Sequence, residues 1–205
     1  IFNAQFPRVI FGAGSLQHLE RELDLLGAKR ALVLSTPEQR GQADDIAKRL
    51  GAHAVGVYDK AVMHTPIESA RAGREEAKRV NADCAIAIGG GSTIGLGKAI
   101  ALDSSLPILA IPTTYAGSEM TPILGITENG IKTTLRDGRM LPKTVIYDAD
   151  LTLTLPAKLS ATSGMNAIAH SVEEHAAIVA ALKSGKPDKA VSAMQRHLDQ
   201  VQRTT

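Results

Sequence analysis

The chain has 205 residues, of which 44% are hydrophobic and 21% charged, and its formal net charge at pH 7 is +2. These values are ordinary for a globular protein of one large domain or two small ones. The positive charges form no basic block and no apolar run is long enough to span a bilayer. We therefore expect neither a nucleic-acid partner nor a membrane partner, and the sequence predicts no signal peptide.

The residues available for a core are small and aliphatic. Aromatic side chains make up only 3% of the chain, and tryptophan is absent. A core of Ala, Val, Ile and Leu favours an α/β protein with a buried parallel sheet over an all-β sandwich. Cys84 is the single cysteine, which excludes an intrachain disulfide and fits a cytoplasmic location. Its apolar neighbours predict a buried strand residue rather than a nucleophile.

Short apolar runs and helical patterns alternate along the first half of the chain. A helix with Ser15 as its N-cap and Gly27 as its stop follows the first run, and Pro66 opens another helix that runs towards Val80. Short connections between strand and helix are typical of a doubly wound parallel sheet. The predicted strands are residues 8–11, 31–34, 53–57, 84–88 and 108–111.

A glycine-rich turn, Gly89-Gly90-Gly91-Ser92, follows the fourth predicted strand and opens a helix. Glycines let the backbone approach a phosphate closely, and the unpaired N–H groups of a helix N-terminus attract it. The spacing is neither G-x-G-x-x-G nor that of a P-loop. Taken alone, the turn fits a phosphate site or an ordinary strand-to-helix connection.

Polar segments follow three predicted strands at one edge of the sheet. Thr36 and Pro37 follow the second strand, the glycine turn follows the fourth, and residues 112–119 follow the fifth. Doubly wound sheets bind ligands beyond the carboxyl ends of their strands. The shared placement of these segments therefore predicts a nucleotide crevice.

The pattern changes after Thr121. Residues 123–127 and 131–135 flank Asn129-Gly130, a strong hairpin signal, and residues 144–147 predict one more strand. We therefore expect a β-hairpin beside the main sheet.

The helix predicted from Leu159 to His170 carries Asn166 and His170 four residues apart, and hence on one face. Two polar side chains of ligating type on a small, apolar helix indicate a functional role. A core histidine with satisfied hydrogen bonds is the alternative.

Four motifs occur in order along the chain: Gly89–Ser92, Pro112–Glu119, Tyr147–Leu151 and Gly164–His170. They resemble the iron-containing alcohol dehydrogenase family over roughly residues 1–173. Within that family the chain is most similar to the maleylacetate reductases, with markers at residues 63–66, 93–98 and 113–117. The resemblance implies an α/β fold with a doubly wound parallel sheet, a Rossmann-like and dehydroquinate synthase-like nicotinamide-binding domain, over residues 1–156. The first helix of a helical catalytic domain is expected over residues 157–173.

The resemblance also implies a cofactor, NADH or NADPH. Thr36 stands where many relatives have an aspartate that excludes NADPH, so both cofactors are expected to bind. The glycine turn is expected to hold the pyrophosphate, and Lys132 to reach a ribose. Thr113, Thr114 and Ser118 are implied as contacts to the nicotinamide side. The implied cofactor-binding residues are Thr36, Pro37, Gly89, Gly90, Gly91, Ser92, Thr113, Thr114, Ser118, Lys132 and Leu151.

Metal-using relatives have an aspartate and a histidine where this chain has Asn166 and His170, and an acidic residue where it has Gly95. A neutral amide is a poor ligand for a divalent cation, so no metal is expected. The resemblance then assigns His170 and Asn166 as catalytic residues. The implied reaction reduces maleylacetate, a small-molecule dicarboxylate, to 3-oxoadipate in aromatic-compound degradation. An iron-dependent alcohol dehydrogenase is the alternative.

The resemblance ends after Glu173. Residues 174–205 resemble the end of the helical effector domain of GntR-type regulators, and their spacing predicts two amphipathic helices joined near Gly185. A chance helical hairpin is the alternative. Since most of the helical domain would be missing, we expect cofactor binding to survive better than turnover, and a catalytically dead nucleotide-binding module or fusion fragment is the second hypothesis. The family resemblance further implies a homodimer.

Overall fold

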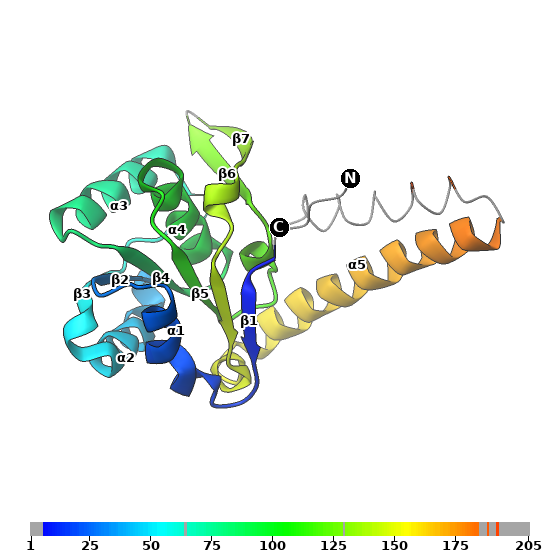
Figure 1. Cartoon of the computed structure of the whole chain (residues 1–205). Coiled ribbons are helices and arrows are strands. Elements are labelled where there is room, and N and C mark those ends of the chain that lie inside the picture. Colours follow the sequence, from blue (N-terminus) through cyan, green and yellow to red (C-terminus); the bar gives the residue numbers. More distant parts are fainter. Residues whose placement is uncertain (1–5, 64, 129, 185–187, 189–191, 193–205) are drawn as a thin grey trace.

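A computed structural model describes residues 6–63, 65–128, 130–184, 188 and 192 of the chain. A six-stranded parallel sheet with the order β1-β8-β5-β4-β2-β3 forms its centre (Figure 1). The predicted doubly wound parallel sheet is therefore confirmed. The strands are β1 (Arg8–Phe11), β2 (Ala31–Leu34), β3 (Ala54–Tyr58), β4 (Cys84–Gly89), β5 (Ile108–Pro112) and β8 (Thr144–Tyr147).

Helices cover both faces of the sheet (Figure 1). Because strand side chains alternate between the faces, Val33 of β2 packs with α1 (Leu19–Leu25) and α2 (Arg40–Leu50). Its neighbours Leu32 and Leu34 pack on the other face, with α3 (Ile67–Arg79) and α4 (Gly91–Ser104). All four residues of β2 are buried, as its continuous apolar sequence predicts for a central parallel strand.

Cys84 lies at the start of β4 and is fully buried, as predicted. Burial raises the pKa of its thiol to about 12. The reactive thiolate form is therefore disfavoured at physiological pH, and the side chain acts as a small apolar core residue.

The predicted hairpin is confirmed as a separate two-stranded sheet of β6 (Ile123–Glu128) and β7 (Ile131–Arg136). Gly130 has a φ of 76°, the left-handed conformation that a tight hairpin turn requires, whereas Asn129 lies outside the described residues. Leu124 and Ile126 of β6 pack in a small core with residues of α3 and α4. The hairpin therefore extends the core beyond the main sheet.

The start of the first helical segment differs from the prediction that Ser15 is an N-cap. Ser15 begins a 3-10 turn that precedes α1, and its hydroxyl donates to the backbone oxygen of Tyr147 at 3.0 Å. The cap comes from Asp148, whose carboxylate accepts the backbone N–H groups of Gly14 and Leu16, each at 2.9 Å. β1 and β8 are parallel neighbours, so their carboxyl ends meet, and a carboxylate accepts these bonds more strongly than a hydroxyl.

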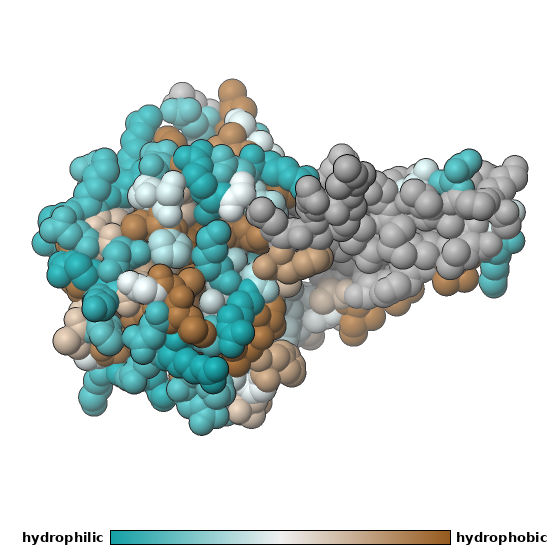
Figure 2. Space-filling view, in the orientation of Figure 1, coloured by the Kyte–Doolittle hydropathy of each residue, from teal (hydrophilic) through white to brown (hydrophobic). Residues whose placement is uncertain are grey.

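α5 is one helix from Ala157 to Lys183 that projects away from the α/β domain (Figure 1). It passes through residue 173 without interruption, so the first predicted tail helix continues the helix before it. Residue 191 and residues 193–205, in the second predicted tail helix, lie outside the described residues. Met165, Ile168 and Val172 are exposed on α5, and Figure 2 shows hydrophobic patches along this projecting arm.

None of the helices in the described part of the chain is both long and apolar enough to cross a membrane.

Candidate dinucleotide site

The centre of the sheet contains a topological switch point. β2 and β4 are neighbours, with Leu34 opposite Ala87. The chain leaves β2 towards α2 on one face and leaves β4 towards α4 on the other. Connections that diverge in this way open a crevice beyond the carboxyl ends of the two strands. The predicted glycine turn lies at this crevice.

Gly89 ends β4 with a φ of 146°, a conformation that side-chain-bearing residues rarely adopt. A Cβ atom at this position would lie 2.5 Å from Oε1 of Gln39 and 2.6 Å from Oγ1 of Thr93. At Gly90 a Cβ atom would lie 3.0 Å from Cγ2 of Thr114. Glycine is therefore required at position 89 by its φ and by Thr93, whereas a side chain at position 90 would need Thr114 to move by a few tenths of an ångström.

α4 begins immediately after this turn, at Gly91. The first N–H groups of a helix have no partner within the helix and, together with the helix dipole, attract an anion. The hydroxyl of Thr93 is buried and has no hydrogen-bond partner in the described part of the chain. The turn thus combines close backbone access with free hydrogen-bonding groups, which suits a phosphate.

A cavity of about 450 Å³ lies on one side of the turn. The side-chain amide of Gln39 donates to Oγ1 of Thr113 at 2.8 Å, which joins the segment after β2 to the end of β5. Thr36 and Pro37 directly precede this lining segment. The cavity brings together the predicted residues Thr113 and Leu151, and its full lining is Glu38, Gln39, Gly41, Gln42, Thr113, Leu151, Thr154, Leu155 and Pro156.

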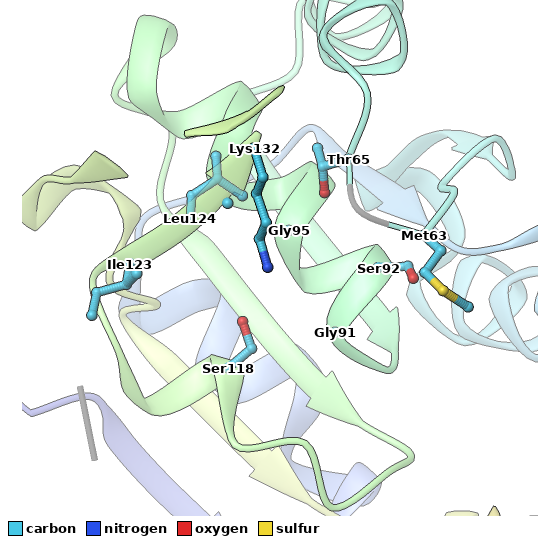
Figure 3. A pocket seen from close by; sticks show the side chains of 10 residues that line it. Met63, Thr65, Gly91, Ser92, Gly95, Ser118, Ile123, Leu124 and Lys132 are labelled. Atoms are coloured by element: carbon cyan, nitrogen blue, oxygen red, sulfur yellow. The ribbon is translucent and has the colours of Figure 1, made fainter. Parts of the chain in front are cut away.

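A second cavity, of about 260 Å³, lies on the other side of the turn (Figure 3). Lys132 reaches it from β7 by crossing Gly125, where a Cβ atom would lie 2.7 Å from Cε of the lysine. Figure 3 shows the Lys132 ammonium group pointing into the cavity. Four predicted cofactor residues meet here, within a lining of Met63, Thr65, Gly91, Ser92, Gly95, Ser118, Ile123, Leu124, Gly125 and Lys132.

Thr65 and Gly95 fit together at one corner of the second cavity (Figure 3). A Cβ atom at Gly95 would lie 2.6 Å from Oγ1 of Thr65. Thr65 has a φ of 41°, a strained conformation for a β-branched residue. Its hydroxyl occupies the space that an acidic side chain at position 95 would need. His64, the neighbouring residue of the subgroup marker, lies outside the described residues.

Lys98 was not among the predicted site residues, although a single lysine in the apolar middle of α4 indicates a buried charge. The side chain is fully buried. Its ammonium group donates to the backbone oxygens of Ser118 and Ile123, at 2.5 and 2.7 Å, and to the hydroxyls of Ser118 and Thr121, at 3.1 and 3.2 Å. Burial lowers the pKa of Lys98 to about 7, against an opposing effect of Glu119. Lys98 therefore fixes the loop that carries Ser118 into the second cavity.

The same loop is held on its other side by Glu119, which was also not among the predicted site residues. The Tyr147 hydroxyl donates to Oε1 of Glu119 at 2.6 Å, and Oε2 is buried without a partner in the described part of the chain. Burial raises the pKa of Glu119. Glu119, Tyr147 and the predicted cofactor residue Thr114 line a third cavity, of about 340 Å³. Thr114 thus lies beside the crevice, but lines neither of the two cavities that flank the glycine turn.

The backbone of the two predicted catalytic residues, Asn166 and His170, lies on α5. Their side chains are outside the described part of the structure. Among the described residues, no group of three or more His, Cys, Asp and Glu side chains is arranged to hold a metal ion. The predicted catalytic roles and the expected absence of a metal therefore stay predictions.

A doubly wound parallel sheet with a glycine-rich helix start at its switch point defines the class of Rossmann-like domains. Comparison with known families identifies the particular one. Residues 7–149 match the sequence model of the family described as iron-containing alcohol dehydrogenase, and the chain belongs to this family. A second model, described as the FCD domain, matches residues 149–200. This match confirms the prediction that the end of the chain resembles a helical effector domain. The matched range begins at residue 149, earlier than the predicted start at residue 174.

Two relatives support the resemblance to the maleylacetate reductases. The chain is 65% identical over 173 residues to a maleylacetate reductase of Burkholderia cepacia, an alignment that covers 84% of this chain and 49% of the relative. The crystal structure of the maleylacetate reductase from Rhizobium sp. strain MTP-10005 has a TM-score of 0.82 at 54% identity, and covers 86% of this chain and 51% of that chain. The chain thus spans about half the length of the relatives that it matches.

Proposed function

We propose that the chain binds a nicotinamide dinucleotide, NADH or NADPH, across the glycine turn. The observation that supports this proposal most strongly is the glycine turn. The turn leads into the start of α4 without a side chain at positions 89–91, and it lies between two cavities. The cavity with Leu151 suits the adenosine end, because it offers apolar surface and hydrogen-bonding groups. Thr113, for which the resemblance implies a contact on the nicotinamide side, also lines this cavity. The cavity with Lys132, Ser92 and Ser118 suits the nicotinamide end, because a cation and hydroxyls can bind ribose and phosphate oxygens.

We further propose that the activity is that of an oxidoreductase which reduces maleylacetate to 3-oxoadipate. The support is the 65% identity to a protein named maleylacetate reductase. When bound, the cofactor would supply the hydride for one carbon of the double bond, and a proton from water would add to the other. Within this chain, Lys98 holds Ser118 in place at the cavity proposed for the nicotinamide end. Asn166 and His170 are proposed to bind or polarise the substrate.

The test combines two readouts on the purified chain. Nicotinamide fluorescence reports binding of NADH, and loss of nicotinamide absorbance after addition of maleylacetate reports its oxidation. Binding with oxidation supports the full proposal. Binding without oxidation identifies a nucleotide-binding module instead, and a folded chain that binds no NADH contradicts both.

Iron independence is a separate part of the proposal, because Asn166 offers a neutral amide where a metal site uses a carboxylate. We expect the purified chain to contain no stoichiometric iron, and its affinity for NADH to be the same with added Fe²⁺ and with a chelator. Metal analysis by mass spectrometry and the fluorescence titration measure the two quantities. Iron bound at one ion per chain, or affinity lost on chelation, would contradict this expectation.

A further inference from the structure

The third cavity, of about 340 Å³, is separate from the two cavities that flank the glycine turn. Its lining shares no residue with either of them. The walls come from the carboxyl ends of β1 and β8 and from the loop after β5, and they include the aromatic residues Phe11, Tyr115 and Tyr147. The proposed dinucleotide site therefore leaves this cavity without a role.

The aromatic side chains make the lining mostly apolar. The rings of Phe11 and Tyr147 have centroids 6.3 Å apart and are tilted by 55° to each other, so they form two walls of different orientation. Phe11 and Tyr115 are 78% and 43% exposed, so a ligand can enter from solvent. The face of an aromatic ring carries partial negative charge, and it attracts a cation within about 6 Å of the ring centre.

The charged side chains in the described lining are two carboxylates, those of Glu119 and Asp148. Three backbone N–H groups donate to the oxygens of Asp148, at 2.9 to 3.2 Å. Glu119 is only 2% exposed, and its Oε1 accepts the Tyr147 hydroxyl, whereas its Oε2 is buried without a partner in the described part of the chain. The negative charge of Glu119 is therefore incompletely compensated by hydrogen bonds.

Lys98 is a cation that acts electrostatically on Glu119, but it does not line the cavity. Its ammonium group donates to four oxygens elsewhere, and burial lowers its pKa to about 7. Above that pH, Lys98 loses most of its charge. A cation that entered the cavity would meet two carboxylates, whereas an anion such as the proposed dicarboxylate substrate would be repelled by them.

We propose that the third cavity binds a small organic ammonium cation. The aromatic rings attract such a cation through their faces, and the carboxylates of Glu119 and Asp148 attract it by charge. A quaternary ammonium group suits the lining best, because its surface is apolar and it needs no hydrogen-bond acceptor. This site goes beyond the proposed oxidoreductase function and does not rest on it.

The experiment compares two probes of nearly equal shape by NMR titration of the full chain. One probe is choline, and the other is its uncharged isostere dimethylbutanol, in which a carbon atom replaces the nitrogen. The backbone amides of Gly117, Ala149 and Thr152 report binding in this cavity, with sodium chloride added to keep the ionic strength constant. The titrations are made at pH 8, where Lys98 is mostly neutral.

We expect choline to bind about tenfold more tightly than the isostere. Two unit charges about 4 Å apart in water change a binding constant roughly fivefold, and the cation–π attraction adds to this. The isostere keeps the apolar contacts but has neither contribution. The difference between the probes therefore measures the attraction for charge alone.

Two variants separate the carboxylate from the rings. Glu119→Gln removes the charge and keeps an oxygen that can accept the Tyr147 hydroxyl, and Tyr115→Leu removes one ring at an exposed position. Each should weaken choline binding about threefold or more. Phe6→Leu makes a matched change at an exposed position outside the cavity lining, and should leave choline binding unchanged.

Equal affinities for the two probes, or unchanged choline binding in the folded cavity variants, would overturn the inference. So would the absence of saturable shifts in the folded chain. Saturating NADH should leave the affinity for choline unchanged, and displacement of choline by NADH would assign the cavity to the dinucleotide site instead. A chain that binds choline but no NADH would support this inference while contradicting the proposed function.

Discussion

Replacement of Gly89 by alanine is expected to lower the affinity for NADH at least a hundredfold. The φ of 146° is unfavourable for alanine, and the new methyl group would lie 2.5 Å from Gln39 and 2.6 Å from Thr93. Relief of these contacts must shift the turn, and with it the N–H groups proposed to bind the pyrophosphate. Movement of Gln39 would also break its hydrogen bond to Thr113 in the neighbouring cavity.

Fluorescence titration with NADH measures this effect, and circular dichroism checks that the variant is folded. Gly164→Ala on α5 is the matched control, because a Cβ atom there meets nothing within 4 Å. Alanine favours helix by about 1 kcal/mol relative to glycine, so this control should bind NADH normally and lose no stability. A folded Gly89→Ala variant with an NADH affinity within about threefold of the wild type would show that the turn is not the phosphate site.

Replacement of Lys98 by methionine is expected to change the pH dependence of stability. Lys98 has a pKa near 7 in the folded chain, below the usual value of 10.5, so between these values the unfolded chain binds more protons. The free energy of unfolding of the wild type, relative to Lys98→Met, should therefore rise with pH from about 7 to 10. A shift of this size corresponds to a rise on the order of a few kcal/mol.

Urea denaturation at several pH values measures the difference. Lys78→Met on α3, an exposed position, is the control and should leave the pH dependence unchanged. Lys98→Met should also weaken NADH binding about tenfold at pH 7, because the loop with Ser118 loses its anchor. A stability difference that stays flat or falls with pH would contradict the assignment of a buried lysine with a lowered pKa.

The sheet and the glycine turn could be predicted because their signals are local in the sequence. A central parallel strand is buried on both faces, so β2 and β4 appear as continuous apolar runs. The run from β4 through Gly89 to α4 also contains its own turn signal. The hairpin of β6 and β7 was predicted for the same reason, since Asn129-Gly130 separates two strand patterns.

Other parts of the site depend on pairs that are distant in sequence. The path of Lys132 across Gly125 requires the register of β6 and β7, and the contact of Thr65 with Gly95 requires α4 to pack against a loop from another segment. The cap of Asp148 on Gly14 likewise follows from the pairing of β1 with β8. None of these pairs leaves a periodic signal in one stretch of sequence.

Glu38 is an intermediate case. Pro37 predicts a helix start and therefore places Glu38 in a first turn, but the sequence does not show that this turn faces a cavity.

The central claim, that a dinucleotide lies across the glycine turn, is tested most directly by NMR mapping of backbone amides during an NADH titration. We predict that the resonances of Gly90, Gly91 and Ser92 shift, together with those of Leu151 in one cavity and Gly125 in the other. Asn81 and Ser104 line a separate cavity at the other ends of α3 and α4, and their resonances should not move. Shifts confined to that cavity, or no shifts in the folded chain, would contradict the claim.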